Sequence, residues 1–308
     1  MSALLPSPAS PLPAARAPLP LRSPAPRLAP PVSPAAMVRT LFAHRYLIWQ
    51  MARREVVGRY RGSLLGLLWS FFHPLLMLAV YTFAFAYVLH ASPRPVATAP
   101  ANAALAPAMS SFALYAFSGL ILFNLFAEAV TRAPVCILQN ATYVKKVVFP
   151  LEILPFVYLV AGLIHAAIST FVLLLATLIV AHSLPITALL APLAVFPLLL
   201  VILGAGWFLA SLGVYLRDVG HIIGIVTMVM MWLAPVFYST DQLSNPLIRE
   251  LLRLNPLTIP MEAFRDLILY GQSPNWWLLG IYTLLATLLA WLGFVFFQRT
   301  KRGFADVV

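Results

Sequence analysis

The chain has 308 residues, of which 62% are hydrophobic and only 9% are charged, whereas soluble domains carry roughly 25% charged residues. Two soluble domains of about 150 residues each could not hide this much apolar surface from water, so the composition excludes an ordinary soluble enzyme and indicates a membrane protein. The net charge of +11 admits three explanations: nucleic-acid binding, an anionic membrane surface, or a topology signal. The single cysteine, Cys136, excludes a disulfide framework, and no cysteine and histidine cluster has zinc-site spacing.

Residues 1–36 form a proline-rich leader. They include eleven prolines, nine alanines, three arginines and no acid, a composition that can neither sustain a helix nor bury a core. The longest apolar run in the leader, residues 3–5, is too short for a secretory signal. We therefore predict a disordered leader over 1–36 and a transmembrane domain over 37–308. The alternative for the leader is that Met37 is the true start.

From Met37 the pattern changes to a helical period. Apolar side chains recur at steps of three, four and seven residues as far as Tyr60, with arginines between them: they are Val38, Leu41, Phe42, Trp49, Val56 and Tyr60. This pattern predicts an amphipathic helix over 37–57 that lies in the membrane interface.

Six longer apolar segments follow, and each could cross about 30 Å of hydrocarbon as a helix, which takes about 20 residues. They are residues 64–89, 108–138, 151–181, 189–216, 219–238 and 276–297. No alternation of period two competes with them, so an outer-membrane barrel is not expected. The predicted fold class is an all-α integral membrane protein with six transmembrane helices.

The distribution of lysine and arginine predicts the orientation. With the N-terminus inside, fifteen of the twenty basic residues fall on the cytoplasmic side and four fall outside, while Arg132 lies within a span. The positive-inside rule then places both termini in the cytoplasm. Since the basic residues report topology, nucleic-acid binding is not expected.

Residues 241–270, between the fifth and sixth spans, do not fit a simple loop. Two short amphipathic stretches are separated by Asn255-Pro256, and each is too short to span. They could dip into the outer leaflet as a re-entrant pair of helices. The alternative is a pair of helices lying on the outer surface, and in both cases Arg249, Arg253 and Arg265 count as outside charges.

Few polar groups fall inside the spans. Glu128 and Arg132 are four residues apart on one face of the second span, so we expect them to form an ion pair at membrane depth. This pair is either structural or part of a conduction path or subunit contact. His73, His165 and His221 occur singly, and we assign them no role.

No enzyme or nucleotide site is apparent in the pattern. No metal site, catalytic triad or pair of carboxylates converges, and the loop after the first span contains no acid, which weighs against a membrane glycosyltransferase. The sequence also lacks G-x-x-x-x-G-K-[ST], so this chain cannot hold ATP phosphates in a Walker loop. If ATP drives the protein, another chain must supply it. Residues 139–150 and 215–221 are cytoplasmic connections that could dock on such a chain, although positive-inside anchoring by itself explains Lys145 and Lys146.

Three sequence blocks occur together in this chain. They are residues 53–55, 59–70 and 74–77; residues 117–120 with Glu128, Arg132, Asn140 and 145–150; and residues 215–218, 235–238 and 254–257. Over about 37–308 the chain resembles the permease subunit of an ABC type 2 exporter, in the branch that exports lipopolysaccharide O-antigen, teichoic acid and related polysaccharides. His73 departs from the asparagine that the family often has before Pro74, and the leader has no counterpart.

The resemblance implies an ATP-driven exporter that moves an undecaprenyl-diphosphate-linked polysaccharide across the bacterial inner membrane. It implies a homodimer of permeases with two ATP-binding cassette subunits, which would hold ATP and Mg, so that this chain would be no enzyme and carry no cofactor. Residues 37–57 would be the interface helix, 139–150 the coupling helix and 241–270 the periplasmic gate helices. The open alternatives are export of a capsular polysaccharide, teichoic acid, small lipid or drug, and a membrane glycosyltransferase.

The resemblance also suggests three groups of site residues. A basic cluster could attract the diphosphate at a substrate entrance, with topology and lipid contact as the alternative: Arg53, Arg54, Arg59 and Arg61. Spans one and five would line a channel with side chains that otherwise face lipid or other helices: Tyr81, Phe85, Tyr87, Met228, Met231 and Trp232. Coupling to the ATPase would fall to Gln139, Asn140, Lys145, Lys146, Arg217 and Asp218.

Overall fold

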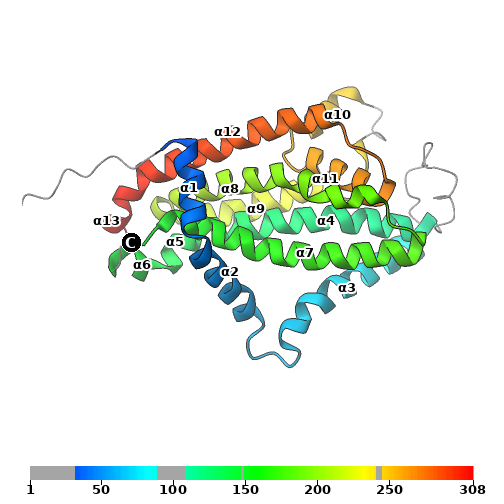
Figure 1. The fold of residues 1–308 in the computed structure, drawn as a ribbon, viewed down its shortest axis with the longest axis horizontal. Helices are drawn as coiled ribbons and strands as arrows, with labels where there is room; N and C mark the ends of the chain where they lie inside the picture. The colour runs from blue at the N-terminus through cyan, green and yellow to red at the C-terminus, as the bar shows by residue number, and fades with distance from the viewer. Residues whose placement is uncertain (1–31, 89–107, 147–148, 241–244, 308) are drawn as a thin grey trace, which may run out of the picture. The chain divides into compact units, whose positions relative to one another are not determined.

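The structure, a computed structural model, describes residues 32–88, 108–146, 149–240 and 245–307 (Figure 1). Every regular element within these ranges is helical, which confirms the predicted all-α class. The proline-rich leader lies outside the described residues as far as Pro31.

Four helical stretches are long and apolar enough to cross a membrane: Phe112–Gln139, Leu151–Ala181, Ile186–Tyr215 and Trp276–Gly303. They correspond to the second, third, fourth and sixth predicted spans. The first and fifth predicted spans are represented by shorter apolar helices, Gly66–Thr82 and Val219–Leu233. The helices that form these stretches are α3 (Trp69–Thr82), α4 (Ala108–Arg132), α5 (Cys136–Gln139), α7 (Leu154–Ala181), α8 (Ala191–Tyr215), α9 (Val219–Leu233) and α12 (Trp276–Thr300).

The fifth predicted span is shorter than expected. Its helix, α9, ends at Leu233, although the apolar pattern continues to Tyr238. Pro235 explains the difference, because its ring disfavours helical geometry at Ala234 and its nitrogen cannot donate a hydrogen bond. The first predicted span continues from α3 into a π-helical segment, η2 (Phe83–Val88), and its predicted last residue, Leu89, lies outside the described residues.

The predicted interface helix is two helices, α1 (Pro34–Ala43) and α2 (Arg45–Tyr60), which meet at His44. Helix α2 packs on α7 through Ile48, Ala52 and Val56, which are spaced by four residues and buried. Of the predicted apolar residues, Val56 belongs to this buried face. Three side chains that we expected on the apolar face are exposed: Val38, Phe42 and Trp49.

Helix α4 lies at the centre of the bundle, where it contacts α3, α7, α8, α9 and α11 (Thr258–Arg265). In the stretch Phe112–Gln139, which contains most of α4, 78% of the most apolar 18 residues are buried, a larger share than in the other three long stretches. The position of α4 matters for function, because Glu128 and Arg132 near its end are held among these neighbours.

Helices α8 and α12 approach each other closely at two glycines. A Cβ atom built on Gly293 would lie 2.2 Å from the carbonyl oxygen of Gly204, and one built on Gly204 would lie 2.7 Å from that of Leu289. Small residues allow this backbone contact, which is typical of helix pairs in membranes. Next to it Trp207 is fully buried and donates from Nε1 to the Glu152 carbonyl oxygen at 2.8 Å.

Gly293→Ala is expected to destabilise the protein by about 1–3 kcal/mol, because the added methyl group forces α8 and α12 apart. Gly280→Ala is the matched control, since Gly280 lies on the same helix and a Cβ atom built on it would have nothing within 4 Å. There alanine should be neutral or slightly stabilising. Thermal unfolding in detergent measures both variants, and equal melting temperatures would contradict the close packing.

Residues 245–270 form two short helices separated at Asn255-Pro256, α10 (Pro246–Arg253) and α11, followed by a π-helical segment, η8 (Asp266–Tyr270). Helix α11 is largely buried and contacts α4, α8 and α12, whereas α10 has no buried residue. The two helices thus differ: α11 enters the bundle and α10 stays on its outside. Residues 241–244 of the predicted segment lie outside the described part of the chain.

Candidate functional site

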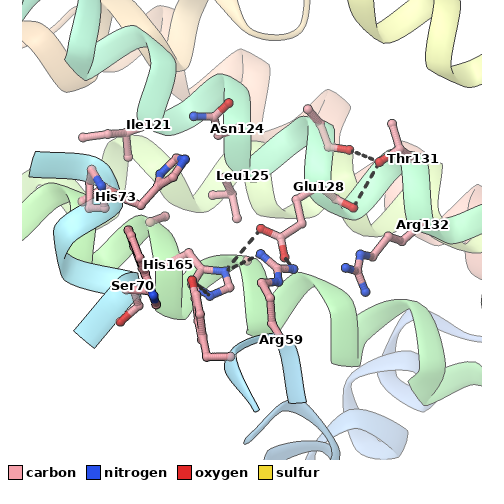
Figure 2. A pocket seen from close by; sticks show the side chains of 17 residues that line it. Arg59, Ser70, His73, Ile121, Asn124, Leu125, Glu128, Thr131, Arg132 and His165 are labelled. Carbon is pink, nitrogen blue, oxygen red and sulfur yellow. Dashed lines mark hydrogen bonds and ion pairs between the residues drawn. The ribbon is translucent and has the colours of Figure 1, made fainter. Parts of the chain in front are cut away.

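A cleft of about 630 Å³ opens between the end of α2 and helices α3, α4 and α7 (Figure 2). The three apolar helices each place polar side chains about one turn apart on its wall. Those on α3 are Ser70 and His73, those on α4 are Asn124, Glu128 and Thr131, and those on α7 are His165 and Ser169. Side chains three or four residues apart share a helix face, so each helix turns one polar strip toward the same space.

Two ion pairs join α2 to α4 beside this cleft. Arg59 pairs with Glu128, and Arg132 pairs with Glu55. On each helix a glutamate precedes an arginine by four residues, and the two helices pass each other in opposite directions, so each charge faces an opposite one. We call Glu55, Arg59, Glu128 and Arg132 the charge clasp.

The expected ion pair between Glu128 and Arg132 is therefore wrong in its pairing. The sequence shows that the two residues share a face of α4, but it does not show that α2 lies against that face. In the structure α2 offers a separate partner to each of them, Arg59 and Glu55. The clasp thereby ties α2 to the central helix of the bundle.

His165, to which we assigned no role, completes the cluster from α7. Its Nδ1 lies 3.3 Å from Nη1 of Arg59 and 3.4 Å from Oε2 of Glu128, and its Nε2 lies 3.4 Å from the Tyr60 hydroxyl oxygen. Burial raises the pKa of Tyr60 above its ordinary value, against the opposing effect of Arg59, so the phenol keeps its proton at neutral pH. The sequence did contain a signal for this role. His165 and Ser169 are four residues apart in an apolar helix, as Asn124 and Glu128 are, and this spacing puts each pair on one helix face.

The predicted entrance arginines separate into two kinds. All four are exposed, but Arg59 also lines the cleft and is paired with Glu128 (Figure 2). After Arg61 the chain reverses at Gly62 and Gly66, whose φ angles of +85° and +51° favour glycine. Figure 1 shows α2 and α3 meeting at this reversal in a V that points away from the other helices.

The predicted channel residues lie on two helices that both pack on α4, namely α3 with its extension η2, and α9. Met228 and Trp232 are exposed on α9, while Tyr81 and Met231 are partly buried against the core. Phe85 and Tyr87 lie in η2, and their side chains are outside the described part.

The two predicted coupling connections lie at the same end of the bundle. The first contains the short helix α6 (Ala141–Lys146), as expected, and Asn140 donates from its side chain to the Cys136 carbonyl oxygen at 2.8 Å. The second contains Arg217 and Asp218, which are exposed, as is Gln139. The two connections are close together because the 3₁₀ turn η4 (Ala133–Val135), which precedes the first, packs against α8, which precedes the second. The side chains of Lys145 and Lys146 are not described.

The C-terminus also packs at this end, which the sequence did not indicate. The short helix α13 (Phe304–Val307) contacts α6. Phe304 is fully buried, with its ring 5.5 Å from that of Phe297. Lys301 holds Glu152 through a 2.6 Å ion pair, so the last turn of the chain supports the same surface as α6.

Arg265 on α11 is buried, contrary to its expected place in an outer loop, with a relative exposure of only 2%. It makes five hydrogen bonds, all to uncharged oxygens. They run from Nε to Ser118 Oγ (3.2 Å), from Nη1 to Tyr115 Oη (2.9 Å) and the Pro235 carbonyl (2.6 Å), and from Nη2 to the carbonyls of Tyr115 (3.2 Å) and Val236 (2.9 Å). These bonds match the five donors of a guanidinium. Arg265 thereby links α11 to α4 and to the segment that follows α9.

Within the described residues, no group of three or more His, Cys, Asp or Glu side chains could hold a metal ion. The candidate site is a polar cleft bordered by the charge clasp.

Comparison with known proteins adds an identity to this geometry. Residues 46–269 match the protein family described as "ABC-2 type transporter". This range includes α2 from its second residue, the cleft, α6 and α11. The chain is 25% identical to an O-antigen export system permease protein RfbA of Myxococcus xanthus, over 88% of this chain and 99% of the relative. It is 23% identical to a protein of the same name from Klebsiella pneumoniae, over 85% of this chain and 95% of the relative. The chain therefore belongs to the ABC-2 type transporter family.

Proposed function

We propose that the chain is the permease subunit of an ATP-driven exporter that moves an undecaprenyl-diphosphate-linked, O-antigen-like polysaccharide across the bacterial inner membrane. The observation that carries this proposal is the similarity, over almost their whole length, to relatives named as O-antigen export permeases. The long apolar helices supply the membrane-embedded part that such a function needs.

The working unit is a homodimer with two ATP-binding cassette subunits, which hold ATP and Mg. Helix α6 and the exposed residues Gln139, Arg217 and Asp218 form the surface on which each ATPase docks. Their common position at one end of the bundle, supported by α13, favours this assignment. ATP binding in the partner then moves α6, and α5 and η4 pass that motion to α4.

Both termini lie in the cytoplasm, and α3 and α9 complete six spans. The exposed apolar side chains of α3 and α9, such as Leu76 and Trp232, are available to line a channel between two copies. Helices α10 and α11 form the periplasmic gate, because α11 enters the bundle at the end opposite α6. Arg53, Arg54 and Arg61 attract the carrier diphosphate at the cytoplasmic surface.

Co-purification tests the assembly. An affinity-tagged chain, extracted in mild detergent from its native cells, is expected to bring down an ATP-binding protein with a Walker loop. Deletion of the gene should leave lipid-linked polysaccharide on the cytoplasmic face, as measured by its protection from added glycosidase in spheroplasts. Export that continues in the deletion strain, or a purified chain that transports by itself, would refute the proposal.

A further inference from the structure

Three polar side chains in the cleft have no hydrogen-bond partner among the described residues. They are His73 on α3, Asn124 on α4 and Ser169 on α7, and all three line the same space. They differ from Glu128, Arg59 and His165 nearby, which bond to one another.

Such groups are costly where a helix meets hydrocarbon, because an unsatisfied amide or hydroxyl loses its hydrogen bonds to water. Asn124 is exposed although the neighbouring residues Ile121 and Leu125 on the same helix are buried. An apolar side chain would suit that position in a plain lipid-facing helix. The arrangement therefore calls for an occupant that offers hydroxyl groups or other polar atoms to three helices at once.

The walls indicate the chemistry of this occupant. Amide, imidazole and hydroxyl groups can donate to and accept from sugar hydroxyls, and the rings of Trp69 and Tyr60 at the cleft can pack on the CH face of a sugar. The positive charges of Arg59 and Arg132 are balanced by Glu128 and Glu55, so the cleft suits a polar ligand with few charges rather than a free anion. A volume of about 630 Å³ is within the usual range of small-molecule sites.

We propose that this cleft binds the first sugar of the lipid-linked saccharide, with its hydroxyl groups on His73, Asn124 and Ser169. The inference rests on the proposed export function and adds to it a site within each permease. The diphosphate stays at the mouth beside Arg61 and the end of α2, and the polyprenyl tail remains in lipid through the open side of the cleft. The site thus recognises the carrier-linked end of the substrate and is separate from the channel between copies.

Cysteine protection tests the site. Cys136 is fully buried, so a Ser169→Cys chain in a Cys136→Ala background carries one reactive thiol in the cleft. The full chain is assayed in inverted membrane vesicles with a water-soluble maleimide. The probes are a short-chain polyprenyl diphosphate N-acetylglucosamine, the same polyprenyl phosphate without sugar, and added phosphatidylglycerol. Gln50→Cys, exposed on α2 and on the cytoplasmic side in the proposed topology, is the matched control.

The sugar-bearing probe is expected to slow labelling of the Ser169→Cys thiol at least fivefold, while the other two probes cause no change and labelling of the Gln50→Cys control stays constant with every probe. Asn124→Leu and His73→Leu should each raise the half-protecting concentration about tenfold, which corresponds to one lost hydrogen bond of about 1.4 kcal/mol. His73→Asn keeps a polar group and should retain protection, and Thr287→Val, which removes a hydroxyl from α12 outside the cleft, should have no effect.

Each other outcome overturns the inference. Equal protection by phosphatidylglycerol or by the sugar-free phosphate would show that the cleft binds lipid phosphates in general. A Ser169→Cys thiol that never reacts with the maleimide would show that water, and therefore a sugar, does not enter the cleft. ATP-dependent export is measured in the same vesicles. If export proceeds while no probe protects the Ser169→Cys thiol, the sugar site is wrong and the exporter stands; if vesicles with intact, correctly inserted protein export nothing, the proposed function fails as well.

Discussion

Replacing Arg265 by methionine is expected to lower the free energy of unfolding by about 1–3 kcal/mol, because buried oxygen acceptors lose their donors. The substitution takes five donors from a site with almost no access to water. The carbonyl oxygens of Pro235 and Val236 then have no hydrogen bond from Arg265, and an unsatisfied buried acceptor costs about 1–3 kcal/mol. Relief of the buried charge offsets part of this loss.

The shape of the site makes the arginine hard to replace. Its Cζ lies 3.6 Å from the centre of the Tyr115 ring, and a Cβ atom on Gly119 would lie 2.3 Å from its Nη2. Lysine has three donors without a planar fork, so Arg265→Lys should recover only part of the stability. Gly119→Ala should also destabilise, because the methyl group would occupy the place of the guanidinium.

Thermal unfolding in detergent measures these variants, with Arg253→Met as the control. Arg253 is an exposed arginine on α10 that pairs with Glu250, and surface ion pairs contribute little. If Arg265→Met melts at the same temperature as Arg253→Met, α11 is not held by this arginine. Export should be lost with Arg265→Met even in a stabilised background if α11 must keep its place against α4.

Reversing one charge of the clasp is expected to reduce export at least tenfold, and reversing both members of a pair should restore most of it. Arg59→Glu places two carboxylates side by side at Glu128, and like charges about 4 Å apart repel by about 4 kcal/mol at an effective dielectric constant of 20. In the Arg59→Glu/Glu128→Arg double variant α2 carries two acids and α4 two arginines, so both pairs form again.

This rescue separates a clasp from a simple attraction for substrate. Arg45→Glu removes a positive charge from an exposed side chain at the start of the same helix, outside the clasp and the proposed entrance, and it serves as the control. Export is measured in a strain that lacks the native gene, after confirming equal membrane insertion. A double variant that stays as inactive as Arg59→Glu, with Arg45→Glu equally affected, would mean that positive charge rather than pairing matters at Arg59.

The clasp gives the proposed coupling route a physical basis. Helix α4 leads through η4 and α5 to α6, and the clasp fastens α2 to α4. A displacement of α6 would therefore move α4, and through the clasp it would move α2. Because α2 continues through the glycine reversal into α3, the displacement would also reach α3. Figure 2 shows the clasp side chains Arg59, Glu128 and Arg132 gathered beside the cleft.

Much of the fold could be predicted from the sequence because its signals are local. Apolar length predicted the second and third spans within a few residues, and the third, Leu151–Ala181, matched at both ends. The proline at 235 and the break at His44 show the limit of this reasoning. There a single residue ended or divided a helix whose apolar pattern continued.

The site was predicted less completely. Glu128, Arg132 and Arg59 were singled out from the sequence, yet with other partners or roles than the pairs seen in the structure, and His165 was left without a role. Arg265 was assigned to an outer loop because it lies between the fifth and sixth predicted spans, in a segment that mixes charges with short amphipathic stretches. Its acceptors come from residues 115–118 and 235–236, which no local pattern connects with it.

The sequence by itself determined that this protein is an all-helical membrane chain of a particular exporter type, because hydrophobic length, helical period and ordered motifs are written along the chain. The tertiary structure alone decided which charges pair, which arginine is buried, and that His73, Asn124 and Ser169 share one cleft. These are contacts between helices that are distant in the chain, and in an apolar surrounding the choice of partner determines whether a polar group stabilises the fold, destabilises it or binds a ligand.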